Sequence, residues 1–347
     1  MLAEIHEQPV ALERTLRAEI KVFRALKKRF ESHRPRLVVL AARGTSDNAG
    51  QFGRYLIEIA TGIPTSLSAP SVATLYHATV DLRDALVVAI SQSGESTDTN
   101  VVLEEAKQQG AFTVGITNEA SSTLARIADQ AILVRAGREK SVAATKTYTG
   151  QLLALYLLAW ALGAPVDLDD LRHLPDGVIA ALKLEDEIAT RAERYRFMDH
   201  ALVIGRGLNY ANAFEFALKL METCYVVAER FSSADLLHGP IAMVGASFPS
   251  FLFAPPGPTW AVIKEMIEKL ESLQAETLVI TDLSHPESHT RSIRIPAHFL
   301  HRGHLPFDVY TPIPYIVPAQ LFAAHLATVK GFNPDQPRGL SKVTLTL

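Results

Sequence analysis

The chain of 347 residues is long enough for about two domains, because a single globular domain usually holds roughly 150 residues. It carries 34 basic and 37 acidic residues, with neither sign gathered in a long block. Charge therefore favours neither nucleic acid nor a membrane surface as a partner. The single cysteine, Cys224, excludes an internal disulfide and a cysteine cluster for a metal, and it favours a reducing cytoplasm.

The N-terminal segment 1–35 is charged and helix-patterned, and it lacks the apolar core of a signal peptide. No later apolar run reaches the ~18 residues that a membrane-spanning helix needs. We therefore expect an N-terminal helical segment followed by cytoplasmic domains without a membrane anchor.

Four short apolar runs follow, at 36–42, 85–91, 112–117 and 130–136, with helix-length amphipathic segments between them. Each run is too apolar for a half-exposed strand, so the alternation predicts a parallel sheet covered by helices on both faces. We assign this first doubly wound α/β domain to residues 36–163.

Residues 164–196 begin with a turn-rich stretch and continue as a charged helix, which is typical of a linker. The alternation then restarts and predicts a second α/β domain over 197–332, ahead of a C-terminal tail at 333–347. The expected elements are strands at 201–207, 248–255, 276–282 and 291–297 and a long apolar helix at 311–329. The two halves therefore look like one fold used twice.

In both halves a glycine-bearing turn joins the first strand to a helix, as RGTSDN at 43–48 and GRGLNY at 205–210. Parallel α/β sheets bind ligands at this carboxyl end of the strands. After its next predicted strand, the first half has the hydroxyl-rich SQSGESTDT (91–99), whereas the second half has APPGPTW (254–260). We therefore expect an anion site in the first half alone.

The loop after the strand at 85–91 allows two interpretations. One hydroxyl could simply cap the following helix, because serine and threonine are common N-caps. A helix N-terminus with several hydroxyl donors also suits phosphate, and a cap needs only one hydroxyl, so we favour a ligand site. Thr45 and Ser46 could approach the same anion from the turn after the first strand. Arg43 is either a surface charge or a partner for a substrate oxygen.

Five stretches in chain order carry a resemblance to a known family. They are SQSGESTDT (91–99), VAATKTYTGQL (142–152), ALKLMETCYVVAERF (217–231), LLHGPIAMV (236–244) and DQPRGLSK (335–342). Together they resemble the isomerase half of glucosamine-6-phosphate synthase, a tandem of two sugar isomerase domains, over nearly the whole chain. The resemblance implies two three-layer α/β domains that need neither a metal nor a cofactor.

The same resemblance assigns roles in binding a sugar phosphate. The residues it implies for the phosphate are Ser46, Ser91, Gln92, Ser93 and Ser96, and those for the sugar are Thr45, Val142 and Ala143. The family pattern has threonine where this chain has Ser96 and serine where it has Ala144. The first difference keeps a hydroxyl, and the second removes one.

Moving a carbonyl between C1 and C2 of a sugar needs a base, and ring opening needs an acid and a base. Glu222 lies in an otherwise apolar helix segment and is either such a base or the ion-pair partner of Lys219. The resemblance favours the base, with Lys219 positioning it. It also implies that His238 opens the ring from a loop donated across a homodimer. Lys342 would form an imine or stabilise an enolate-like charge.

The synthase carries a glutamine-hydrolysing half that begins with a nucleophilic cysteine, whereas position 2 here is Leu2. We therefore expect no glutaminase activity. The leading hypothesis is a deaminase and isomerase that interconverts glucosamine-6-phosphate with fructose-6-phosphate and ammonia. One alternative is a deglycase for fructosamine 6-phosphates. A second is a non-catalytic sugar-phosphate sensor, which should lack Glu222 and Lys342 and carry a DNA-binding module.

Overall fold

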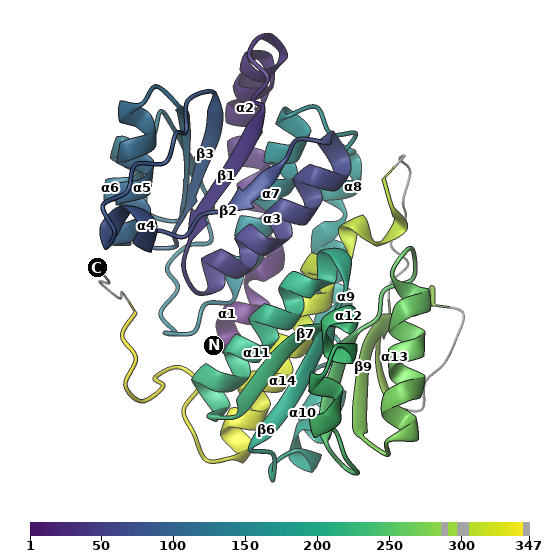
Figure 1. The fold of residues 1–347 in the computed structure, drawn as a ribbon. Coiled ribbons are helices and arrows are strands. Elements are labelled where there is room, and N and C mark those ends of the chain that lie inside the picture. The colour runs from purple at the N-terminus through teal and green to yellow at the C-terminus, as the bar shows by residue number, and fades with distance from the viewer. Residues whose placement is uncertain (286–290, 297–304, 343–347) are drawn as a thin grey trace. The chain divides into compact units, whose positions relative to one another are not determined.

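The computed structural model describes residues 1–285, 291–296 and 305–342, and the chain in it divides into two compact units (Figure 1). The first-sheet unit comprises Val10–Glu139, Lys146–Leu168 and Ser341–Leu347. The second-sheet unit comprises Met1–Pro9, Lys140–Thr145 and Asp169–Leu340. Residue 297 of the last expected strand and residues 343–347 of the expected tail lie outside the described residues. Within the described ranges, no helix is long and apolar enough to cross a membrane.

The first-sheet unit is a five-stranded parallel sheet in the order β2-β1-β3-β4-β5. Its elements are most of α2 (Gln8–Ser32), β1 (Leu37–Ala42), α3 (Thr45–Thr61), β2 (Thr65–Leu67), α4 (Ser71–Thr74), β3 (Ala85–Ile90), α5 (Thr97–Gln108), β4 (Phe112–Thr117), α6 (Thr123–Ile127), β5 (Gln130–Leu133) and α7 (Lys146–Ala161).

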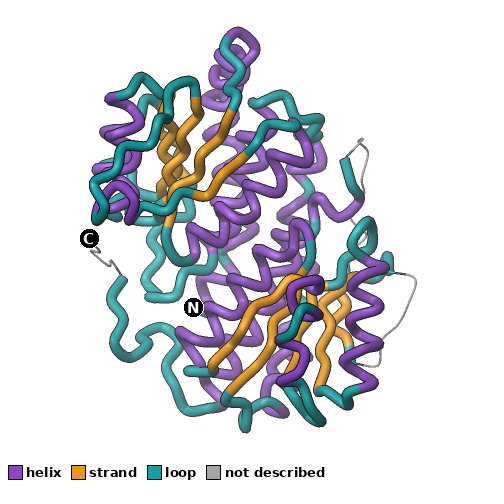
Figure 2. Tube along the Cα trace, in the orientation of Figure 1, coloured by secondary structure: helices purple, strands orange, loops and turns teal. Residues whose placement is uncertain are grey.

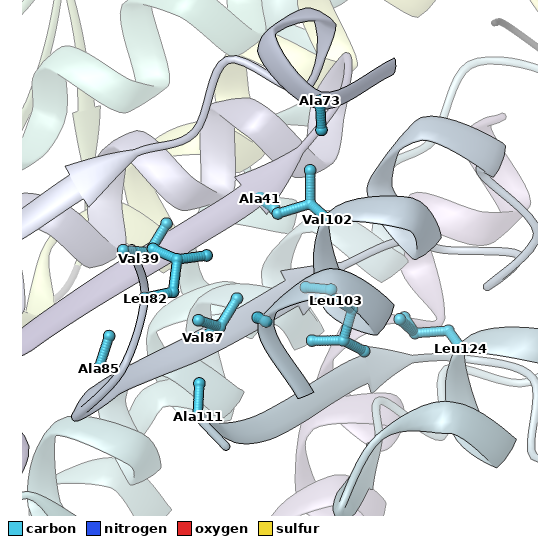
Figure 3. Close-up of a cluster of buried hydrophobic side chains, with 12 residues drawn as sticks. Val39, Ala41, Ala73, Leu82, Ala85, Val87, Val102, Leu103, Ala111 and Leu124 are labelled. Atoms are coloured by element: carbon cyan, nitrogen blue, oxygen red, sulfur yellow. The ribbon is translucent and has the colours of Figure 1, made fainter. Parts of the chain in front are cut away.

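Alternate residues of the central strands face opposite helical layers, as a parallel sheet buried on both faces requires. Val39 and Val87 join Val102 and Leu103 of α5 in one buried cluster (Figure 3). On the opposite face, Leu40 lies against Gly50 and Gly53 of α3, and α7 packs on the same helix. The predicted three-layer α/β architecture is therefore confirmed for this half.

The second-sheet unit repeats the design with a parallel sheet in the order β10-β9-β8-β6-β7. Its elements are α1 (Leu2–His6), α8 (Leu168–Arg172), α9 (Leu174–Leu182), α10 (Glu185–Arg194), β6 (His200–Gly205), η1 (Gly207–Asn209), α11 (Tyr210–Cys224), β7 (Val227–Ser232), α12 (Ser233–Leu237), η2 (Pro240–Met243), β8 (Pro249–Phe253), α13 (Trp260–Ser272), β9 (Glu276–Asp282), β10 (Ser292–Ile295), η3 (Phe307–Tyr310) and α14 (Pro312–Val329).

Helices cover both faces of the second sheet as well. Leu252 of β8 packs with Ile263 of α13, whereas its neighbour Phe251 packs against Phe216 of α11 and Phe322 of α14. Figure 2 shows the strands of each sheet gathered together, with helices beside them. The residues expected to form a linker contain α8, α9 and α10, and both α9 and α10 pack on α14.

Read from β7, the second order is β7-β6-β8-β9-β10, which matches β2-β1-β3-β4-β5 strand for strand. The expectation of one fold used twice is thus confirmed. In each sheet the chain leaves the first strand toward one edge and returns on its other side, so a switch point lies between β1 and β3 and between β6 and β8. Such points are where open α/β sheets bind ligands.

Candidate functional site

The serine loop, residues 91–96, joins β3 to α5 at the first switch point. Its turn depends on Gly94, whose φ of +67° is costly for a residue with a side chain. A Cβ there would also lie 2.2 Å from Ser122 Oγ. The glycine is therefore required both by the backbone conformation and by the close approach of the β4–α6 connection.

Neighbouring groups hold the carbonyl oxygens of this loop. Gln92 O accepts hydrogen bonds from Asn118 N–H at 3.1 Å and from the Thr117 hydroxyl at 3.3 Å. Gly94 O accepts from Leu124 N–H at 3.0 Å and from Asn100 Nδ2 at 3.2 Å. The loop is thus fixed from the turn after β4, from α6 and from α5, which preorganises it for a ligand.

Three serine hydroxyls already accept a hydrogen bond from the protein. Ser91 Oγ accepts from Gly94 N–H at 3.1 Å, and Ser93 Oγ accepts from Glu95 N–H at 3.3 Å. Ser46 Oγ, in the first turn of α3, accepts from Gln151 Nε2 of α7 at 2.9 Å. A hydroxyl carries one hydrogen, and these contacts leave it for an acceptor such as a phosphate oxygen. Sequence reasoning missed Gln151, although it lies within the 142–152 motif.

Ser96 differs from the other three serines. Its Oγ lies 3.0 Å from Asp98 Oδ1 and 2.9 Å from Thr99 Oγ1. An ionised carboxylate only accepts hydrogen bonds, so Ser96 donates its hydrogen to Asp98. Of the residues predicted to bind phosphate, Ser96 is therefore the one whose hydroxyl hydrogen is already engaged.

The second switch point has a different chemistry. APPGPTW follows β8 and holds Pro255, Pro256 and Pro258, each of which lacks a backbone N–H. It also has fewer hydroxyls than the serine loop, so it offers an anion fewer donors, in keeping with the contrast between the two sequences.

Helix α11 carries a buried charged triad. Lys219 Nζ lies 2.6 Å from Glu222 Oε2 and 3.4 Å from Glu215 Oε1. The Lys219 and Glu215 side chains are fully buried, whereas Glu222 is 23% exposed and is thus the member that a ligand could reach. Burial alone would lower the pKa of Lys219, but the two carboxylates outweigh it and raise that pKa above the ordinary value.

The sequence had left Glu222 as either a base or a partner of Lys219, and the structure contains the ion pair. Glu215 was missed. It lies four residues before Lys219 in an apolar helix, and that spacing could have identified it.

The other predicted catalytic residues lie on loops. His238 is exposed and follows α12, with its backbone N–H bonded to Asp235 O at 3.1 Å. Lys342 Nζ lies 3.4 Å from Glu139 Oε2, and the buried Glu139 also accepts a 2.6 Å hydrogen bond from the Thr147 hydroxyl. Sequence reasoning missed Glu139, because nothing in its local pattern points to Lys342.

The C-terminal tail is anchored before it reaches Lys342. The guanidinium of Arg338 stacks over the Tyr225 ring at 4.3 Å, and its backbone N–H donates to the Tyr225 hydroxyl at 2.9 Å. Tyr225 caps the C-terminus of α11, three residues beyond Glu222. Val142 N–H donates to Asp335 O at 3.2 Å, so the segment with Val142 and Ala143 also contacts the tail.

The predicted site residues divide between the two units. The first-sheet unit contains Thr45, Ser46, Ser91, Gln92, Ser93, Ser96 and Lys342, and the second-sheet unit contains Val142, Ala143, Lys219, Glu222 and His238. Among the described residues, no three His, Cys, Asp or Glu side chains gather as a metal site would require.

Comparison with known proteins identifies relatives along the whole chain. The SIS domain family model matches residues 33–161 and 196–329. A glutamine–fructose-6-phosphate aminotransferase of Pyrococcus horikoshii is 36% identical over 348 residues, which cover 99% of this chain and 57% of that protein. The chain thus spans little more than half the length of the curated relatives it matches.

Two solved structures share the fold. The C-terminal domain of glucosamine-fructose-6-phosphate aminotransferase from Francisella tularensis is 31% identical, with a TM-score of 0.86 over 97% of this chain and 98% of that one. A glucosamine-6-phosphate deaminase from Thermotoga maritima is 23% identical, with a TM-score of 0.77 over 99% of both chains, and that likeness concerns the fold alone.

Proposed function

The chain belongs to the SIS domain family, and on that premise we propose that it is an aminosugar phosphate deaminase and isomerase. The reaction interconverts glucosamine-6-phosphate and water with fructose-6-phosphate and ammonia. The observation that carries the proposal is the α11 triad, in which buried Lys219 holds the partly exposed carboxylate of Glu222. A carboxylate fixed in this way is suited to moving a proton between two adjacent carbons.

In the proposed reaction, Glu222 takes the proton from C2 of the ring-opened aminosugar and returns it to C1. Together with the passage of one proton from the amine nitrogen to O1, this transfer converts the C1 aldehyde and C2 amine into a C1 alcohol and a C2 imine. Water then hydrolyses the imine, which leaves the ketone and releases ammonia. His238 opens the ring, and Lys342 offers an amine that forms an imine or stabilises the enolate-like charge.

The serine loop and Ser46 of α3 bind the phosphate in this proposal. Its support is the hydrogen-bond geometry of Ser46, Ser91 and Ser93, whose oxygens accept from the protein and whose hydrogens are left for the ligand. The start of α5 adds the positive end of a helix dipole. Gln92 contributes from the same loop, and Thr45, Val142 and Ala143 line the sugar.

Ammonia rather than glutamine is the nitrogen partner that we propose. Cysteine-dependent glutamine hydrolysis needs an accessible, reactive thiolate. Cys224 is the single cysteine of these 347 residues, and it is buried. Burial raises the pKa of its thiol to about 11, and the thiol donates a hydrogen bond to Ala323 O at 3.2 Å. This thiol is unsuited to nucleophilic attack. The free cysteine also agrees with the cytoplasmic location that we propose.

The decisive experiment measures ammonia and fructose-6-phosphate released from glucosamine-6-phosphate. We expect equal amounts of both products, and no glutamate when glutamine is supplied. Glu222→Gln should abolish turnover, whereas Glu229→Gln, an exposed change in the same unit, should not. Turnover of a fructosamine 6-phosphate without ammonia release from glucosamine-6-phosphate would instead identify a deglycase. Binding without any turnover would identify a sensor.

A further inference from the structure

Arg43 is the residue whose role the sequence leaves undecided, and its contacts in the structure are specific. It follows β1 directly, with its side chain 50% exposed, and it faces an aspartate that is 2% exposed. Its Nε lies 2.7 Å from Asp98 Oδ2, and its Nη2 lies 2.6 Å from the same oxygen. Two guanidinium nitrogens on one carboxylate oxygen fix the direction of both side chains.

The other oxygen of Asp98 organises the end of the serine loop. Asp98 Oδ1 accepts from the Ser96 hydroxyl at 3.0 Å and from Thr99 N–H at 3.0 Å. Asp98 thus supports the first turn of α5 from a buried position. It also places a negative charge two residues from a loop suited to an anion, and that charge would repel a phosphate if nothing compensated it.

The second copy of the fold provides an internal comparison. Arg206 follows β6 as Arg43 follows β1, but its Nη1 donates to the neutral Ser232 hydroxyl at 3.1 Å. The turn APPGPTW after β8 contains no acidic residue. The arginine is therefore present at both switch points, whereas the arginine–carboxylate pair occurs at the one with the serine loop.

We propose that Arg43 is a positioning residue of the phosphate site, which cancels the charge of Asp98 so that the serine loop accepts a dianionic phosphate. This inference rests on the proposed phosphate-binding role of the loop. Arg43 acts through Asp98 rather than on the phosphate itself, because two of its nitrogens are committed to that carboxylate. Arg43 therefore strengthens the binding of ligands that carry a phosphate group and does not affect the binding of the unphosphorylated aminosugar.

The test compares Arg43→Ala with the double variant Arg43→Ala/Asp98→Asn. Arg43→Ala leaves the Asp98 charge uncompensated and should weaken glucosamine-6-phosphate binding about tenfold, as a higher KM with a similar kcat. The asparagine side chain of the double variant keeps an oxygen for Ser96 and Thr99 but carries no charge. The double variant should therefore bind more tightly than Arg43→Ala and return to within about threefold of the wild type.

Calorimetry with glucosamine-6-phosphate and with inorganic phosphate, in the Glu222→Gln background, reports binding without turnover. Glucosamine is the unphosphorylated control, and Arg43→Ala should not change its binding. Thermal unfolding checks that each variant is folded, and Arg43→Gln carries the same comparison if Arg43→Ala does not fold. Arg43→Lys keeps the positive charge and should bind almost as the wild type does.

Two results would overturn the role of Arg43 while leaving the phosphate site intact. If Asp98→Asn does not restore binding in the Arg43→Ala background, Arg43 contacts the phosphate directly. If Arg43→Ala binds as the wild type does, Arg43 is only a surface charge. Failure of the parent Glu222→Gln protein to bind either phosphate ligand is a distinct outcome, which overturns the proposed function and this inference together.

Discussion

Lys219 and Glu222 form an ion pair with 2.6 Å between Nζ and Oε2, in which the lysine is fully buried and the carboxylate is 23% exposed. This asymmetry separates two roles within one pair. The lysine is closed off from any ligand and supports the helix interior together with Glu215. The carboxylate reaches the surface, so it is the member available for proton transfer.

Lys219→Met should be strongly destabilising, because it leaves two carboxylates without their buried counter-charge. We expect a loss of about 3 kcal/mol in the free energy of unfolding, measured with denaturant. The folded-state pKa of Lys219 is raised above the unfolded-state pKa of about 10.4. The contribution of Lys219 to stability is therefore fully present below about pH 10.4 and is lost only as the pH rises through the higher folded-state pKa. The loss should thus be constant between about pH 6 and 9. The exposed Lys183→Met is the matched control, and an equal loss there would contradict the triad.

Gly94→Ala should impair both stability and phosphate binding. The new methyl group would meet Ser122 Oγ at 2.2 Å in a left-handed backbone, so the loop must shift. Overpacking of this kind costs about 1–3 kcal/mol. Gly62→Ala is the control for backbone strain alone, because Gly62 has a φ of +69° and nothing within 4 Å of its added Cβ. Equal effects of the two variants on phosphate affinity would argue against a serine loop that is held in a phosphate-binding conformation by its packing against Ser122.

Asp308, in η3, should make stability fall as the pH rises from about 4 to 6. Burial raises the pKa of its carboxyl to about 6, so in this window the folded chain holds a proton that the unfolded chain has lost. Asp308→Asn should remove this dependence and gain on the order of 3 kcal/mol at pH 7. Other carboxyls titrate in the same range, so the measurement is the difference in unfolding free energy between variant and wild type at each pH. A difference that does not change with pH would contradict the assignment.

His238 gives a test of the proposed homodimer. Leu237 and Met243, one residue before and five residues after it in the chain, are 55% and 45% exposed, and exposed apolar side chains suit a subunit contact. If His238 serves the partner's site, co-expressing Glu222→Gln with His238→Ala should recover about a quarter of the wild-type ammonia release, because half of the dimers then hold one complete site. Each variant alone should be inactive. No recovery in verified mixed dimers would place His238 in its own subunit's reaction.

The strands that sequence predicts best are those buried on both faces. β1 and β3 are continuous apolar runs, and β6, β8 and β9 each contain a buried apolar stretch, as expected for central parallel strands. The strands that were missed, β2 and β7, lie at sheet edges. β2 has three residues, and β7 holds the adjacent charged residues Glu229 and Arg230, both of which are exposed, so neither strand gives a continuous apolar run.

The candidate site likewise contains some residues that are close together in the sequence and others that only folding brings together. The serine loop is local, and its residues are adjacent in the chain. Glu215 could also have been found, since it is one helical turn from Lys219. The pairs Ser46–Gln151 and Glu139–Lys342 join residues 105 and 203 positions apart, and only the folded chain brings them together.

The stack of Arg338 on Tyr225 makes the tail a short tether. Lys342 lies four residues farther on, and four extended residues span at most about 14 Å. Even when its amine leaves Glu139, the Lys342 backbone stays within that radius of the anchored Arg338. A tethered group of this kind is present at an effective concentration of at least millimolar order. In the proposed reaction, the entropic cost of keeping the Lys342 amine near its anchor is thus met when the chain folds.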